Sequence, residues 1–133
     1  MIYLLDTHTF IWAALKTDKL SENCKQIISN RDNAICVSTI SFWEIALKTG
    51  MGKFSFKNID INKFPKLARE MDFTVVDMQE DEAITFHKLP LKENHKDPFD
   101  RMLIWQAITK NMTMLSKDVF FAQYKKDGLK LVW

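Results

Sequence analysis

Short apolar runs alternate with stretches of helical spacing along the chain, and this alternation determines the fold class. The first run ends directly at Asp6. Strands that alternate with helices pair in parallel through crossover connections, so we predict a doubly wound α/β sandwich with helices on both faces of the sheet. The first strand, which is apolar throughout, is expected at the centre. The predicted strands are Ile2–Leu5, Ala34–Val37, Phe73–Val76, Met112–Leu115 and Leu129–Trp133.

Helix-capping residues mark several of the intervening segments. The strongest pattern begins at Asp97, a good N-cap, and Pro98, which suits a first helical position. Pro65 weakens the prediction for the first half of one other helix. The predicted helices are His8–Leu15, Ser21–Ser29, Ser38–Lys48, Asp60–Met71, Glu80–His87, Pro98–Lys110 and Val119–Tyr124.

The composition fits one globular domain over residues 1–133. Hydrophobic residues make up 47% of the chain and charged residues 27%, which excludes a disordered or fibrous protein. No apolar run approaches the roughly 20 residues of a membrane span, so we expect no membrane association and a cytoplasmic location. Cys24 and Cys36 form no metal-binding pattern and are expected to be reduced and buried.

The charge is too small and too mixed to identify a partner by itself. Nineteen basic residues against 17 acidic ones give a net charge of +2. Between Ser41 and Arg69, however, six basic residues face only two acids. Solvated helix faces are the simplest interpretation, so this basic segment matters for function only if it borders an active site.

Four acids are placed to meet at one edge of the predicted sheet. Asp6 ends the first strand, and Asp118 follows the fourth strand by three residues. Glu44 lies in the helix after the second strand, and Asp100 lies in the first turn of the helix that leads to the fourth. In doubly wound sheets the functional crevice lies beyond the carboxyl ends of the strands. We therefore expect these four carboxylates to converge there.

A cluster of carboxylates indicates a bound cation. Like charges a few ångströms apart repel and raise one another's pKa, so an uncompensated cluster is unfavourable. Carboxylate oxygens without His or Cys partners favour Mg²⁺ or Mn²⁺ over zinc, and Mg²⁺ leaves positions for water and substrate phosphate. This chemistry indicates phosphodiester hydrolysis.

Each acid also has a structural interpretation. Asp97 and Asp118 fit helix N-caps, and Asp100 complements a helix dipole. Glu44 completes a capping box if its helix begins at Ser41. Asp6 is the hardest to explain structurally, because an acid directly after a buried strand is costly unless it is paired or bound.

Histidines and tryptophans give weaker signals. The histidines lack metal-binding spacing and are predicted at surface or turn positions; they are His8, His87 and His95. The tryptophans at helical positions are expected mainly in the core or a dimer contact, with stacking on RNA bases as the minor alternative; they are Trp12, Trp43 and Trp105.

Four segments together resemble the PIN domains, and within them the VapC-like toxins that pair with Phd/YefM-type antitoxins. The most specific segment reads HKDPFDRMLIWQA, from His95 to Ala107. The other three are Leu4–His8, Ser38–Phe54 and Leu115–Asp118. By this resemblance the acidic site consists of Asp6, Glu44, Asp100 and Asp118, with Asp97 as an auxiliary residue.

The resemblance implies a three-layer α/β/α sandwich with a five-stranded parallel sheet and a metal-dependent ribonuclease that dimerises and is inhibited by an antitoxin. Asp6, Asp100 and Asp118 would hold one or two Mg²⁺ or Mn²⁺ ions, and Glu44 would complete the site or orient water. Thr7 and Ser116 are expected to support the acids through hydrogen bonds. The residues expected to contact RNA phosphates are Arg101, Lys48 and Lys53.

Two alternatives come from other classes. A phosphotransfer domain also places an Asp after its first strand, but the phosphatase pattern needs a second Asp where this chain has His8. A receiver domain needs paired acids near the first strand and an acceptor Asp after the third, and neither is evident. The second alternative is a PIN-like module that binds RNA or protein without catalysis, and the intact acids argue against it.

Overall fold

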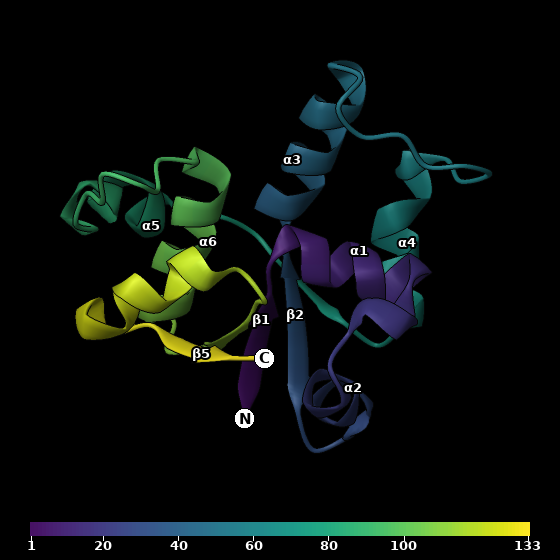
Figure 1. Cartoon of the computed structure of the whole chain (residues 1–133), viewed down its shortest axis with the longest axis horizontal. Helices are drawn as coiled ribbons and strands as arrows, with labels where there is room; N and C mark the ends of the chain where they lie inside the picture. Colours follow the sequence, from purple (N-terminus) through teal and green to yellow (C-terminus); the bar gives the residue numbers. More distant parts are fainter.

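Five parallel strands form one sheet in the computed structural model, which describes residues 1–133 (Figure 1). The strand order is β3-β2-β1-β4-β5, so the first strand is central, as predicted. Tyr3 of β1 pairs with Ile35 on one side and with Thr113 on the other. The strands are β1 (Ile2–Leu5), β2 (Ala34–Ser38), β3 (Thr74–Val76), β4 (Thr113–Leu115) and β5 (Lys130–Val132).

Helices cover both faces of this sheet, which confirms the predicted α/β sandwich. Figure 1 shows α1, α2 and α4 on one side of the strands and α5 and α6 on the other. The α-helices are α1 (Thr7–Leu15), α2 (Glu22–Ser29), α3 (Thr39–Gly50), α4 (Phe64–Glu70), α5 (Glu80–Thr85) and α6 (Pro98–Thr109). The 3-10 helices are η1 (Thr17–Lys19), η2 (Ile61–Lys63), η3 (Phe86–Lys88) and η4 (Val119–Asp127).

Alternate residues of the strands divide the interior into two cores. Leu5 and Val37 belong to the core that also contains Phe10 of α1 and Phe64 of α4. Leu4, Cys36 and Met114 belong to the second core, together with Leu103 of α6 and Tyr124 of η4. Successive side chains of a strand point to opposite faces, so strands buried on both sides must be apolar throughout.

Side-chain caps mark the starts of several helices. The side chains of Ser21 and Asp97 accept backbone hydrogen bonds at the starts of α2 and α6, as predicted. Helix α3, however, begins at Thr39, where the Ser38 hydroxyl accepts from the Ile40 amide. The capping box with Ser41 and Glu44 is therefore wrong, because both residues lie inside the helix.

The strands are added first to one side of β1 and then to the other. From β1 the chain runs outward to β2 and β3, and later returns to β4 and β5 on the other side. The amide of Asp6 donates to the carbonyl of Leu115 (3.3 Å), which holds the ends of β1 and β4 together. Ligand sites of doubly wound sheets lie at such a switch point.

Both cysteines are free and buried, as predicted. Burial raises the pKa of the Cys24 and Cys36 thiols, which keeps them protonated and unreactive. None of the helices is both long and apolar enough to cross a bilayer.

Candidate active site

A cavity of about 380 Å³ at the switch point contains all four predicted acids. Five carboxylates, two lysines, a histidine and a tryptophan line it. These residues are Asp6, His8, Trp12, Glu44, Lys48, Asp97, Asp100, Lys117 and Asp118. Segments that are far apart in the sequence thus bring their negative charges to one edge of the sheet.

Asp6 is held by hydrogen bonds to both of its carboxylate oxygens. One oxygen accepts from the Thr9 amide (2.8 Å), which makes Asp6 the N-cap of α1. The other accepts from the Ser116 hydroxyl. Burial raises the pKa of Asp6, and the hydrogen bonds from Ser116 and Thr9 oppose that shift. Ser116 therefore provides the support predicted for it.

Glu44 is buried and is held from two sides. The Thr7 hydroxyl donates to Glu44 Oε1 (2.6 Å) and lies 3.0 Å from the Ser41 hydroxyl. Lys48, one turn further along α3, pairs with Glu44 Oε2. Thr7 thus supports Glu44, while Lys48 balances part of its charge.

Asp100 is affected both by burial and by the charges of the other acids. Burial raises its pKa to about 8, with further contributions from the charges of Asp97, Glu44, Asp6 and Asp118. The Asp97 side chain caps α6 by accepting from the Asp100 amide (3.0 Å). Asp97 is therefore both the predicted helix cap and a neighbour that keeps Asp100 protonated in the absence of a cation.

The donor set fits a divalent cation, but its grouping differs from the predicted trio of ligands. Potential ligand atoms lie within 4.8 Å of one another in two groups that share Asp100. One contains Glu44 and Asp97, and the other contains His95 and Asp118. Asp6 belongs to neither group, although it lines the same cavity. Carboxylate oxygens fit the chemistry of a Mg²⁺ or Mn²⁺ site, and Asp100 would lose its proton on binding the ion.

His95 lies at the end of a turn, as predicted, but it is not at the surface. Its side chain is buried at 6% exposure, with Nδ1 2.9 Å from the Tyr124 hydroxyl. Its Nε2 lies 3.4 Å from Asp100 Oδ2. Burial lowers the pKa of His95, which favours the neutral ring. The only sequence signal was its place at the start of the motif that contains Asp100.

Arg101 also differs from its predicted role. It is buried at 7% exposure and donates to the carbonyls of Leu89 (2.9 Å) and Pro90 (3.4 Å). Its guanidinium lies over the Phe86 ring. The predicted contact of Arg101 with RNA phosphate is therefore wrong, because its donors hold the loop before α6.

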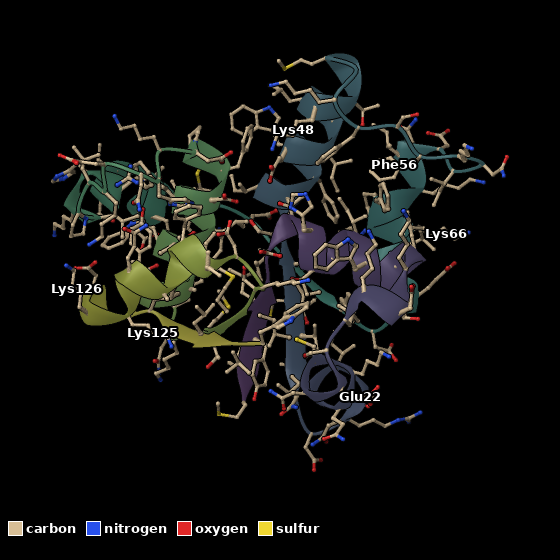
Figure 2. All side chains as sticks on the ribbon, in the orientation of Figure 1. Glu22, Lys48, Phe56, Lys66, Lys125 and Lys126 are labelled. Atoms are coloured by element: carbon tan, nitrogen blue, oxygen red, sulfur yellow. The ribbon has the colours of Figure 1, made fainter.

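The lysines around the cavity differ in how freely they can meet a phosphate. Burial lowers the pKa of Lys48, but its hydrogen bond to Glu44 and the nearby acids raise it more, so the ammonium is committed to the cluster. Figure 2 shows Lys48 on α3 and Lys66 far away on α4. Lys53 is exposed outside the cavity wall. Lys117 lines the cavity without an ion pair, although it was not among the residues predicted to contact RNA phosphates.

The model of the PIN domain family matches residues 3–127 of the chain. The chain therefore belongs to the PIN domain family. A search of curated proteins gave no match.

Solved structures with the same fold include three VapBC complexes. VapBC2 from Rickettsia felis, bound to a DNA fragment from its promoter, is 22% identical and has a TM-score of 0.67 over 99% of this chain and 98% of its own. DNA-bound VapBC from Salmonella typhimurium is 15% identical, with a TM-score of 0.65 over 99% and 97%. VapBC-1 from nontypeable Haemophilus influenzae is 17% identical, with a TM-score of 0.61 over 99% and 97%. At these identities the likeness concerns the fold.

Proposed function

We propose that this PIN domain is a Mg²⁺- or Mn²⁺-dependent endoribonuclease and the VapC-like toxin of a toxin–antitoxin pair. The observation that carries the proposal is the cavity with five carboxylates, in which Asp100 has a pKa of about 8. Such a cluster is unfavourable unless a cation balances it. Likeness in fold to VapBC complexes supports the toxin assignment.

Asp100, Asp118 and Glu44 would hold the cation directly, and Asp6 directly or through water. A bound ion supplies a water of lowered pKa and stabilises the charge that develops on the phosphate. Glu44, fixed by Thr7, would orient that water. In-line attack would break the bond from phosphorus to the 3′ oxygen, which would take a proton from solvent, and would leave a 5′-phosphate and a 3′-hydroxyl.

The fixed side chains prepare this chemistry before substrate arrives. Asp6 cannot rotate freely, since Thr9 and Ser116 hold both of its oxygens. Lys117 is the free ammonium of the cavity and would contact a phosphate that flanks the cut. Lys53, which is exposed beyond α3, would contact the backbone further along.

Cleavage of RNA by the purified protein tests the proposal. We expect cleavage with Mg²⁺ or Mn²⁺, none with EDTA, and none with Asp6→Asn, which keeps the shape of the side chain. Glu22→Gln removes one acid from exposed α2 and serves as the matched control with full activity (Figure 2). Cleavage by Asp6→Asn, or cleavage that EDTA leaves unchanged, contradicts the mechanism.

A protein partner is the second part of the proposal. Along α3 and its C-cap, Trp43, Leu47 and Met51 are exposed by 59%, 39% and 58%, an apolar stripe with a spacing of four residues. Apolar surface of this kind is typical of protein interfaces. We propose a Phd/YefM-type antitoxin as the inhibitory partner. We also propose that the protein forms a homodimer and that it acts on RNA in the cytoplasm.

Association is tested by its effect on both mass and activity. A small protein encoded next to this chain should copurify with it and suppress cleavage, and light scattering of the isolated chain should give the mass of a dimer. A monomer that no such neighbour inhibits contradicts the toxin–antitoxin assignment. RNA binding without cleavage in either metal would favour the alternative of an inactive binding module.

A further inference from the structure

The wall of the cavity on the α1 side has a different chemistry from the rest. His8 and Trp12 line the cavity together with the acids, and Trp12 is its single hydrophobic lining residue. The two residues are four apart on one helix, so they share a face. Their ring centroids lie 6.0 Å apart with an angle of 53° between the planes. An aromatic wall therefore stands beside the carboxylates.

Both rings are held in place by neighbours from other parts of the chain. Trp133 meets Trp12 edge to face at 6.0 Å, and the Lys19 ammonium lies 5.8 Å from the centre of the Trp12 ring. Phe54 meets His8 edge to face, also at 6.0 Å. Trp12 packs partly against the first core, yet it contributes to the cavity surface. Its orientation is thus fixed before any ligand arrives.

Charge restricts how an RNA strand can cross this cavity. Five carboxylates repel phosphates wherever no cation lies between them, so only the phosphate at the metal can approach the acids closely. The neighbouring nucleotide has to turn toward a surface without negative charge. His8 and Trp12 offer that surface, and Lys19 and Lys117 lie near it for the adjoining phosphates.

We propose that His8 and Trp12 form a stacking subsite for an unpaired nucleobase next to the phosphate that is cut. This inference rests on the proposed ribonuclease function and specifies its substrate as single-stranded or looped RNA. Aromatic side chains stack on any base, but only a base that is not already stacked in a duplex is free to reach them. The subsite therefore selects RNA by its structure and tolerates different sequences.

Equilibrium binding in Mg²⁺ separates this subsite from catalysis when the parent chain and each variant also carry Asp6→Asn, which blocks cleavage. The probe is a labelled 12-nucleotide RNA, measured alone and annealed to its complement. We expect the parent chain to bind the single strand more tightly than the duplex. Trp12→Leu should weaken binding of the single strand by roughly 5- to 150-fold and leave duplex binding unchanged, while Trp12→Phe keeps most of the affinity. His8→Ala, at an exposed position, should act in the same direction without disturbing the core.

Trp105→Phe is the matched control. Trp105 lies on α6, donates to the Thr85 hydroxyl and is absent from the cavity wall, so its replacement should leave both affinities unchanged. The subsite is wrong if Trp12→Leu and His8→Ala bind the single strand like the parent chain, or if they weaken binding of both RNAs equally. If wild type cleaves no RNA but its single-strand preference depends on Trp12, the ribonuclease proposal fails and the subsite stands.

Discussion

At the scale of single residues, the burial of Asp100 among other acids makes the metal-free protein sensitive to pH. Its pKa is about 8 in the fold, against an ordinary value of 3.8. The unfolded chain therefore loses this proton near pH 4, whereas the folded chain keeps it up to about pH 8. The stabilisation from this proton is complete below pH 4 and is lost as the pH rises through about 8.

The melting temperature in EDTA should accordingly fall between pH 5 and pH 8. Asp100→Asn carries no titrating group and should flatten this decline, while Glu22→Gln keeps it. Mg²⁺ should raise the melting temperature of wild type, because a cation replaces the proton and relieves the repulsion. A parallel decline of Asp100→Asn and wild type contradicts this account.

The buried contact between His95 and Tyr124 gives a second test for single residues. Tyr124→Phe leaves His95 Nδ1 without its partner, so we expect a loss of about 1 to 3 kcal/mol in the free energy of unfolding. Because His95 also touches Asp100, metal affinity should fall about 10-fold. Urea denaturation and a Mn²⁺ titration measure the two effects. Unchanged metal affinity would limit Tyr124 to a packing role.

The sequence predicted the chemistry of single residues better than their exposure. The acids could be predicted because their distance in sequence from the ends of the strands can be counted. The orientation of Arg101 was not predicted. Successive residues of a helix point about 100° apart, so the side chain next to Asp100 turns away from the cavity. The burial of His95 depends on Tyr124, a contact across 29 positions that no local pattern reveals.

At the scale of elements, Asp6 joins the start of α1 to the candidate site. Asn keeps the oxygen that accepts from Thr9, whereas Ala removes it. We expect Asp6→Ala to be less stable than Asp6→Asn by about 1 kcal/mol, the usual contribution of an N-cap. Both variants should be inactive. Equal stability of the two in urea denaturation would show that the cap contributes little.

Element boundaries were predictable where capping residues mark them. The segment around Pro65 divides into η2 and α4, because a proline fits only the first turn of a helix. Beyond Tyr124, η4 continues to Asp127 and ends at Gly128, whose φ of 108° is left-handed. No apolar periodicity marks these last residues, so the prediction ended too early.

At the scale of the whole molecule, we expect the free lysine of the cavity, Lys117, to contribute to the salt dependence of the proposed RNA binding. Each phosphate neutralised by a lysine adds about 0.7 to the slope of log affinity against log salt for single strands. Lys117→Gln should weaken binding and reduce the slope by about that amount. Lys66→Gln, on the remote helix α4, is the control (Figure 2). An unchanged slope for Lys117→Gln removes the proposed phosphate contact.

The architecture was largely predictable because alternating strands and helices permit few topologies. The order of the sheet placed β1 beside β4, and with it Asp6 beside the segment that carries Asp118. The particular grouping of ligands was not predictable, since it depends on distances of a few ångströms between side chains from different elements.

The hydrogen bond from Ser116 to Asp6 spans 110 positions of the chain. The candidate site therefore requires both halves of the chain to be folded together. We expect the proposed cleavage to be lost in the same cooperative transition as the tertiary structure, and also after a single proteolytic cut that lets the two halves separate.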